Sequence, residues 1–547
     1  MKPNTRRPVP KHPFLADSSY TTGHVNVAIA LNTPAIGFGD IGRPLSADEI
    51  SWLPAGGYIT SIRYSGVYPD GRRVAWTGGG SLLYKYDADS RAVLAETEVL
   101  PIGIRMTAEA VRRHVDRIDS LSGKEQLAVA IPPISTDLAP VVYTIYHNFV
   151  SNENEQYLGV NDLANKRIQL RVYGDAVEGD PASAIALRRE LTLPDADPFK
   201  AMLFSISMTF DGTVLAMLTD GTLFAISRDL KLLDRISLAH DPINATPGAA
   251  GKDNETLNLF VRNVLSLDDD GGIYILPRDY LHRVQWTGKK FSRDEADGAW
   301  RVAYDSGPRG SGTSPNMMGW GDDEDKLIIL SSGTEPYVMA YWRDKIPHDW
   351  KGLPGEDRRL AARAPAYYGD EYHAKGSIKE FTNAVKGYGV FFGNDMAVGN
   401  YARDVGFVST AEGGGYASMD EFLAFAFGVG KKPEYTPRAG LKLEWNPRSR
   451  SFDHQWRTQR SFATMLPIID GNDVLYYIGT ENGVWTLEGI DWNTGQLKFK
   501  YELGSSQRFN PVGTALEIAP NGALDCPCGG GLGWVRVLPK PAAAPAS

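Results

Sequence analysis

Residues 203–238 read LFSISMTFDGTVLAMLTDGTLFAISRDLKLLDRISL. Apolar residues dominate four short runs in this stretch, at 203–209, 213–218, 222–227 and 230–238. An Asp-Gly pair separates the first run from the second and the second from the third, and this dipeptide is typical of the tight turn of an antiparallel hairpin. The pattern therefore predicts four consecutive antiparallel strands.

The same unit of four strands recurs along the chain. A second clear set lies at 58–64, 73–78, 81–87 and 92–99. Further sets are predicted through 259–302, 317–343 and 464–501, with weaker ones through 127–173 and 381–456. A last set has only three strands, at 512–518, 523–527 and 533–538. Turns recur with the strands, at Asp70-Gly71, Asp211-Gly212, Asp270-Gly271, Asp470-Gly471 and Asn521-Gly522.

Four-stranded units spaced by ~40–50 residues are the signature of a β-propeller, in which each blade packs on the next. A β-sandwich would need far fewer strands. We predict an all-β protein in which residues 1–547 form a single β-propeller of eight blades; seven is the alternative, because the second and sixth sets are poorly defined. An N-terminal run at 25–31 is expected to supply the missing strand and close the ring.

Three segments do not follow the strand pattern. Residues 107–121 place Val111, Val115 and Ile118 on one stripe, which predicts a helix docked on the ring. Residues 346–380 are rich in proline, glycine and tyrosine, and residues 395–440 contain a capping-box pattern. We interpret the last two as insertions between blades that cover one end of the ring as a lid.

Composition limits the class of protein. The chain has 547 residues, 42% of them hydrophobic, which is typical of a globular protein rather than a disordered one. The net charge of -9 argues against a general nucleic-acid binder. No apolar run of signal-peptide or membrane-span length is found, so we expect a cytoplasmic protein with no membrane partner. Only two cysteines occur, Cys526 and Cys528, and we interpret them as inert thiols.

Residues 262–274 read RNVLSLDDDGGIY, which resembles the start of a blade in the gluconolactonase, strictosidine-synthase and paraoxonase group of propellers. In that group the asparagine at the head of the inner strand faces the central channel and helps to bind calcium. The resemblance therefore implies that Asn263 is a Ca²⁺ ligand. The chain departs from the group in two respects: no counterpart of the group's glutamate ligand is found on the first blade, and those propellers usually have six blades.

The heads of the other innermost strands are also expected to face the axis, where propellers usually bind ligands. On this basis we predict Asn394 as a second metal ligand, because amide oxygens suit calcium. His24 and His147 are predicted as general base or ligand, against the alternative of hydrogen-bonded structural histidines. Contacts to the substrate are predicted for Asn26, Asn148, Asp395, Tyr367 and Phe422. For each asparagine the alternative is a turn or cap residue.

Motifs of other enzyme classes are missing or fail their context. Residues 37–42 read GFGDIG, but Pro44 follows and no helix can begin there, which excludes a dinucleotide loop. The sequence contains no G-x-S-x-G, no Walker A loop and no H-E-x-x-H.

Two classes of function follow. The first is an enzyme whose site lies at the mouth of the central channel, with a cation that assists hydrolysis or isomerisation of a small, partly apolar lactone or ester. The second is a non-catalytic scaffold that binds a protein partner, although no repeat of the WD type is present. A propeller oxidoreductase is a further alternative. The aromatic residues of the two insertions favour a small-molecule ligand.

Overall fold

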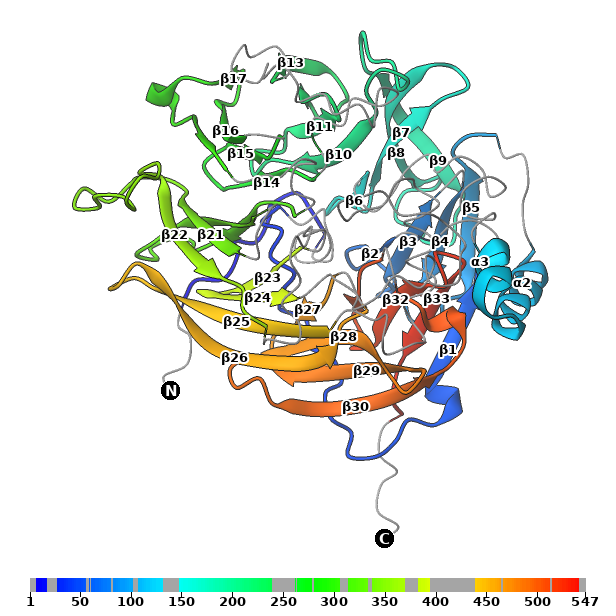
Figure 1. The fold of residues 1–547 in the computed structure, drawn as a ribbon. Helices are drawn as coiled ribbons and strands as arrows, with labels where there is room; N and C mark the ends of the chain where they lie inside the picture. Colours follow the sequence, from blue (N-terminus) through cyan, green and yellow to red (C-terminus); the bar gives the residue numbers. More distant parts are fainter. Residues whose placement is uncertain are drawn as a thin grey trace.

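The computed structural model describes residues 6–16, 27–55, 59, 61–79, 82–101, 107–130, 147–238, 261, 263–277, 280–304, 313–332, 337–368, 382–393, 438–463, 466–511 and 514–540. Within these ranges the strands form eight separate antiparallel sheets, arranged around a central axis as the blades of a β-propeller (Figure 1). The predicted fold class and the predicted eight blades are confirmed.

Each of the first four blades takes consecutive strands, from the innermost outward. Blade 1 holds β2 (Ser61–Tyr64), β3 (Val74–Gly79), β4 (Leu82–Asp87) and β5 (Val93–Glu98), and blade 2 holds β6 (Asn148–Val150), β7 (Gln156–Asp162), β8 (Arg167–Asp175) and β9 (Ile185–Thr192). Blade 3 holds β10 (Leu203–Met208), β11 (Val214–Leu218), β12 (Thr222–Ile226) and β13 (Leu232–Ser237). Blade 4 holds β14 (Ser266–Leu267), β15 (Gly272–Ile275), β16 (Tyr280–Trp286) and β17 (Phe291–Ser292), with β18 (Trp300–Ala303) also paired to β16.

The next three blades follow the same order. Blade 5 holds β19 (Asn316–Met318), β20 (Leu327–Ser331), β21 (Tyr337–Trp342) and β22 (Leu360–Pro365). Blade 6 holds β23 (Ala384–Lys386), β24 (Gly389–Gly393), β25 (Arg438–Asn446) and β26 (Ser451–Ser461). Blade 7 holds β27 (Ile468–Ile469), β28 (Val474–Glu481), β29 (Val484–Asp491) and β30 (Leu497–Gly504). The short 3-10 helices are η1 (Ala47–Glu49), η4 (Glu295–Asp297) and η6 (Gln507–Phe509).

Blade 8 closes the ring. It consists of β31 (Glu517–Ile518), β32 (Leu524–Cys528), β33 (Gly533–Val537) and an N-terminal outermost strand, β1 (Ile50–Pro54). Closure by an N-terminal strand is therefore confirmed, but the prediction that residues 25–31 provide it is wrong. Four of the five residues of β1 are half-buried, as suits an outer strand, whereas residues 27–31 are buried throughout and belong at the centre of the molecule.

The apolar segment 27–33 lines the axis beside blades 4 to 7, where it crosses the centre of Figure 1 in blue. Its carbonyl oxygens accept hydrogen bonds from the innermost strands of four successive blades or their immediate flanks: Val27 from Leu267 (2.7 Å), Ala28 from Met317 (3.0 Å), Ala30 from Val385 (2.8 Å) and Leu31 from Ile469 (2.9 Å). The positive φ angles of Ile29 (49°) and Leu31 (51°) break the extended geometry of a strand. The segment thus joins four blades with one short stretch of backbone.

The ring has two distinct ends. At one end, which we call the turn end, each innermost strand turns into the second strand of its blade, as at Asp470-Gly471. At the other end, which we call the loop end, the innermost strands begin. Residues 6–16, the N-terminal arm, cross the turn end. The arm is held by hydrogen bonds that link Arg7 to Asp322 and Asp323, His12 to Met208, and Phe14 to Asn152.

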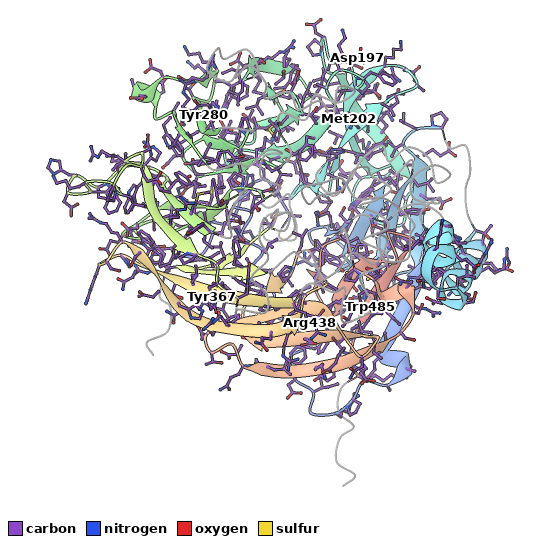
Figure 2. The ribbon with its side chains drawn as sticks, viewed as in Figure 1. Asp197, Met202, Tyr280, Tyr367, Arg438 and Trp485 are labelled. Atoms are coloured by element: carbon purple, nitrogen blue, oxygen red, sulfur yellow. The ribbon has the colours of Figure 1, made fainter. Side chains whose placement is uncertain are left out.

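Apolar side chains fill the spaces between neighbouring sheets (Figure 2). Between blades 1 and 2, for example, Trp76 packs in one cluster with Leu158 and Val160. Between blades 8 and 1, Trp534 meets Tyr86 edge to face, with ring centroids 5.6 Å apart. The core is therefore divided among the blade interfaces, as expected for a propeller.

The predicted helix is confirmed as α2 (Ala108–Ser120), whose cap Thr107 accepts a hydrogen bond from the backbone of Ala110. Its buried Val111 and Val115 pack on Leu532. A second helix, α3 (Gly123–Ala130), was not predicted, and it includes the first residues of the weak set placed at 127–173. Neither described helix has the length and apolar character needed to cross a membrane.

The predicted insertions are described only in part. Residues 346–380 are not wholly an insertion, because they contain β22, the outermost strand of blade 5, which the prediction had placed before residue 343. Residues 394–437 lie outside the described residues. The hydroxyl of Tyr368, after β22, donates to the carbonyl of Gly393 at the end of β24 (3.1 Å), so the two connections leave the ring at adjacent points of its loop end.

Candidate functional site

A cavity of about 110 Å³ lies at the turn end of the axis. The N-terminal arm, segment 27–33 and blades 5, 6 and 7 contribute to its walls. Its apolar part is made by Ala30, Met317 and Val385, all buried. These residues come from segment 27–33 and from the innermost strands it binds, so the same hydrogen bonds that fix the segment also fix this part of the cavity.

Two tryptophans provide the aromatic surface. Trp320 follows β19 and is 3% exposed, and Trp492 follows β29 and is 1% exposed. The position of Trp492 depends on Gly389: a Cβ at that residue would lie 2.8 Å from Cζ2 of the indole and 2.7 Å from Cε of Lys442. A side chain at residue 389 would therefore force the indole to move.

The described lining carries three cationic side chains, Arg6, Arg7 and Lys386, and one carboxylate, Asp473. Lys386 Nζ lies 2.5 Å from Asp473 Oδ1. Arg7 Nε lies 2.5 Å from Asp322 Oδ1, outside the cavity, and this pair lowers the pKa of Asp322 to about 2. These ion pairs orient Arg7 and Lys386, and the guanidinium of Arg6 stands 3.9 Å from the ring centroid of Tyr388.

Polar groups suited to a ligand also line the cavity. Asn32 donates its Nδ2 to the carbonyl of Val385 (2.5 Å), which holds its amide in place. In the part of the chain that the structure describes, Nε1 of Trp492 has no hydrogen-bond partner. Other buried tryptophans, such as Trp485, share this property, but Trp485 does not line the cavity. This N–H is therefore the candidate donor for a ligand that carries an acceptor.

None of the predicted site residues that the structure describes lines this cavity. His24, Asn26, Asn394, Asp395 and Phe422 lie outside the described residues. Their predicted roles stay predictions.

His147 and Asn148 are adjacent on blade 2, at the loop end of the ring. His147 is buried, and burial lowers its pKa to about 4, although hydrogen bonds to the backbone of Phe204 and Leu203 act in the opposite direction. Asn148 Oδ1 accepts a hydrogen bond from Ser61 on blade 1 (3.1 Å). The structure thus gives both residues contacts between blades, and their predicted roles at a site stay predictions.

Asn263 is buried at the start of blade 4, and its Nδ2 donates to the carbonyl of Leu276 in the same blade (3.0 Å). Among the described residues no group of three or more His, Cys, Asp or Glu is arranged to hold a metal ion. The calcium ligand set therefore stays a prediction.

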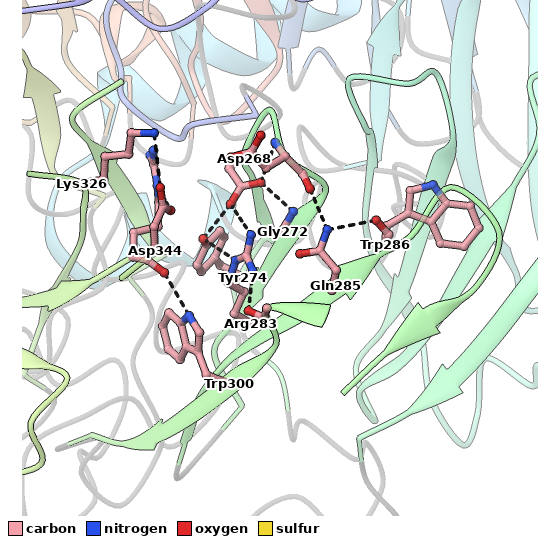
Figure 3. A network of polar contacts seen from close by, with 12 residues as sticks. Asp268, Gly272, Tyr274, Arg283, Gln285, Trp286, Trp300, Lys326 and Asp344 are labelled. Carbon is pink, nitrogen blue, oxygen red and sulfur yellow. Dashed lines mark hydrogen bonds and ion pairs between the residues drawn. The ribbon is translucent and has the colours of Figure 1, made fainter. Parts of the chain in front are cut away.

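Two residues of the stretch that resembles the gluconolactonase group, Asp268 and Tyr274, belong to a buried polar network (Figure 3). Asp268 accepts hydrogen bonds from the Tyr274 hydroxyl (2.7 Å), the backbone of Gly272 (2.6 Å) and Arg283 (3.2 Å). The neighbouring Arg283 lowers the pKa of Asp268 against the effect of burial. Blade 7 repeats the arrangement with Asp470 and Tyr476, so this carboxylate stabilises a turn.

Tyr367 is 39% exposed and lies against β26, where the guanidinium of Arg457 stands 5.2 Å from its ring centroid. This is the outermost strand of blade 6, so the ring is on the outer side of the blade rather than beside the axis. Tyr367 lies on the outer side because it is only two residues beyond the end of β22, an outer strand.

The cavity residues carry no sequence motif. The available signals were the paired Arg6-Arg7 and the wholly apolar run at 27–31, which is more apolar than an outer strand needs. Neither signal identifies a cavity by itself, because the partners lie hundreds of residues away: Arg7 and Asp323 are separated by 316 positions.

No protein-family model matches the chain. An uncharacterised protein of Archaeoglobus fulgidus is 25% identical over 476 residues, which are 85% of this chain and 77% of that protein.

Solved structures with a similar arrangement include three whose matches cover most of this chain. BamB from Moraxella catarrhalis is 10% identical, with a TM-score of 0.41, and the match covers 93% of this chain and 100% of that one. The Dos1 propeller is 9% identical, with a TM-score of 0.45 over 89% of this chain and 94% of that one. Streptogramin B lyase is 8% identical, with a TM-score of 0.36 over 89% and 96%. Because these TM-scores are low, the fold of this chain is assigned from its own eight sheets.

Proposed function

We propose that this propeller binds a small organic anion with an apolar or aromatic body in the cavity at the turn end of the axis. The observation that carries the proposal is the composition of that cavity, which combines two tryptophans with three cationic side chains against one carboxylate. A pocket that combines apolar and aromatic walls with a few fixed polar groups is typical of a small-molecule site.

The described groups favour binding rather than catalysis. Lys386 and Asp473 are paired with each other, and no histidine, serine or cysteine is found among the described lining residues. The described lining therefore offers no hydroxyl or thiol nucleophile beside a histidine base, which is one common arrangement of covalent catalysis. Its groups can orient an anion and shield its body from water.

Benzoate is a suitable probe, because it joins a carboxylate to an aromatic ring. We expect saturable binding of benzoate by calorimetry and weaker binding of benzyl alcohol, its neutral relative. Trp492→Phe removes the indole N–H and keeps an aromatic ring, so benzoate affinity should fall about five- to tenfold, the effect of one hydrogen bond.

Trp485→Phe is the matched control. It removes an unpartnered indole N–H from a buried tryptophan of the same blade, outside the cavity, and benzoate affinity should not change. Equal affinities of both variants and the parent protein would place benzoate elsewhere. No saturable binding of either probe would overturn the proposal.

Hydrolysis of a lactone, which the resemblance implies, is a second proposal, and it concerns the loop end of the ring. Its test is turnover of dihydrocoumarin with added Ca²⁺, compared with turnover after EDTA treatment. Loss of turnover in His147→Asn, with the melting temperature preserved at neutral pH, would support a catalytic role. Turnover that is absent under all conditions would leave the chain as a binding protein.

A further inference from the structure

A second polar cluster lies between the innermost strands of blades 8, 1 and 2. Arg63 of β2 is fully buried, and its Nη1 donates to Glu517 of β31, which is 1% exposed. On the other side, Ser61 of β2 donates to Asn148 of β6 (3.1 Å). The backbone hydrogen bonds described for segment 27–33 go to blades 4 to 7, so this cluster occupies the opposite side of the ring.

The contacts of β2 indicate that the Arg63 side chain passes along the inner edge of its blade. Side chains alternate along a strand, so Arg63 leaves β2 on the same face as Ser61 and opposite Ile62 and Tyr64. Ile62 and Tyr64 pack toward blade 8, and Ser61 contacts blade 2. Arg63 nevertheless reaches Glu517 of blade 8. It must therefore pass the inner edge of β2, which borders the central channel.

The guanidinium is incompletely satisfied. Nη1 also donates to the carbonyl of Ile62 (3.2 Å), but within the described ranges Nε and Nη2 have no hydrogen-bond partner. Among the buried arginines that the structure describes, Arg63 is the one with two such nitrogens. Buried donors without acceptors are costly, and more so on a charged group.

Arg536, at the interface between blades 8 and 1, is an arginine whose Nε and Nη2 both bind a carboxylate. It is 4% exposed, and Nε and Nη2 bind both oxygens of Asp525 at 2.8 and 2.7 Å. Its remaining nitrogen donates to the carbonyl of Asp89 (2.7 Å). The edge formed by Nε and Nη2 therefore binds a carboxylate in Arg536, whereas no described residue accepts a hydrogen bond from this edge in Arg63.

We propose that Arg63 is the anchor of a second anion site, in the central channel beside blades 8, 1 and 2, which takes a small carboxylate on its Nε and Nη2. Two parallel N–H···O bonds from this edge are the usual geometry of arginine with carboxylate. Glu517 neutralises part of the charge and fixes the guanidinium, so the site selects a small monoanion rather than a highly charged one. This inference is independent of the cavity at the turn end.

Acetate is the probe, titrated against the intact protein at constant ionic strength with chloride as the replaced anion. We expect a saturable rise in melting temperature with acetate that chloride does not produce. Arg63→Lys keeps the charge but lacks the forked edge, and it should weaken acetate binding at least tenfold. Glu517→Gln removes the competing carboxylate and should strengthen acetate binding about tenfold.

Two variants show whether the response to acetate comes from Arg63. Arg536→Lys disturbs an arginine with no free donor, so it should lower the melting temperature and leave the response to acetate unchanged. Trp492→Phe should also leave the response unchanged, because it alters only the cavity at the turn end. If that variant abolished the response instead, acetate would belong to the turn-end cavity, and this inference would be overturned without harm to the proposed function.

The Glu517→Gln variant keeps the test decisive even if Arg63→Lys does not fold. If acetate and chloride change the melting temperature equally, in both the parent protein and Glu517→Gln, then water alone satisfies Nε and Nη2 of Arg63. That result would overturn the inference. An Arg63→Lys protein that folds and binds acetate as tightly as the parent would also overturn the inference.

Discussion

His12 anchors the N-terminal arm through a neutral ring. Its Nε2 lies 3.0 Å from the carbonyl of Met208, and its Nδ1 accepts a hydrogen bond from the backbone of Phe14 (3.1 Å). Accepting at one nitrogen while the other donates requires the neutral form. Burial accordingly lowers the pKa of His12 to about 4, and the same holds for His147.

These two histidines predict a loss of stability in mild acid. Their pKa in the folded state lies below the unfolded value of about 6.5, so the unfolded state binds more protons as pH falls. The free energy of unfolding is therefore highest above pH ~6.5 and falls as the pH is lowered toward ~4. At pH 5 each histidine lowers it by about 2 kcal/mol. Urea unfolding at pH 7 and at pH 5 measures this loss of stability. The difference in unfolding free energy between the two pH values should be smaller in His12→Asn than in the parent protein. An unchanged difference in His12→Asn would show that the ring is not kept neutral.

The Asp268 network of Figure 3 predicts a second effect at the scale of one residue. Asp268→Ala leaves Arg283, 9% exposed in its side chain, without its carboxylate. Removal of one partner from a buried pair costs about 3 kcal/mol or more. Chemical denaturation should show this loss, and a smaller one for Asp268→Asn, which keeps an acceptor for Tyr274. A loss below about 1 kcal/mol would mean that water replaces the carboxylate.

At the scale of the element, ring closure depends on a close approach between β1 and β33. A Cβ at Gly533 would lie 2.1 Å from Nε1 of Trp52 and 2.8 Å from the carbonyl oxygen of Leu53. Gly533→Ala should therefore displace β1 and lower stability by about 1–3 kcal/mol. Gly393→Ala is the control, because its nearest atom would be 3.6 Å away. Equal melting temperatures of the two variants would contradict the described register.

The N-terminal arm is an element that matters more for the cavity than for the ring. Deletion of residues 1–11 removes Arg6 and Arg7 from the cavity wall and keeps the His12 anchor. We expect a small change in melting temperature, because exposed ion pairs such as that of Arg7 with Asp322 contribute little. Benzoate affinity should fall severalfold by calorimetry. Unchanged affinity would show that the arm does not contribute to binding.

For the whole molecule, the prediction of calcium near Asn263 has a direct test. Metal analysis of protein purified without chelator should find calcium, and EDTA should lower the melting temperature. Asn263→Ala should abolish both effects, whereas Asn161→Ala, at a described contact between blades 2 and 3, should leave the metal content unchanged. Protein without bound metal, and with the same melting temperature in calcium and EDTA, would remove the cation-assisted mechanism and leave the fold as it is.

The sequence alone determined the ring, the number of blades, the turns and α2. Strand alternation, Asp-Gly turns and a helical stripe are local patterns, and the forces behind them act within a few residues. The strands of blade 3 lie within one residue or two of their predicted bounds for this reason.

The tertiary structure alone decided which segments meet. Residues 27–31 and β1 are both short apolar stretches, and only ring closure determines that the first lines the axis and the second completes blade 8. The cavity and the Arg63 cluster likewise join residues from the arm, the first blade and the last blades. Such contacts depend on the summed packing of eight blades, which no local pattern encodes, and so the candidate sites became visible only in the folded chain.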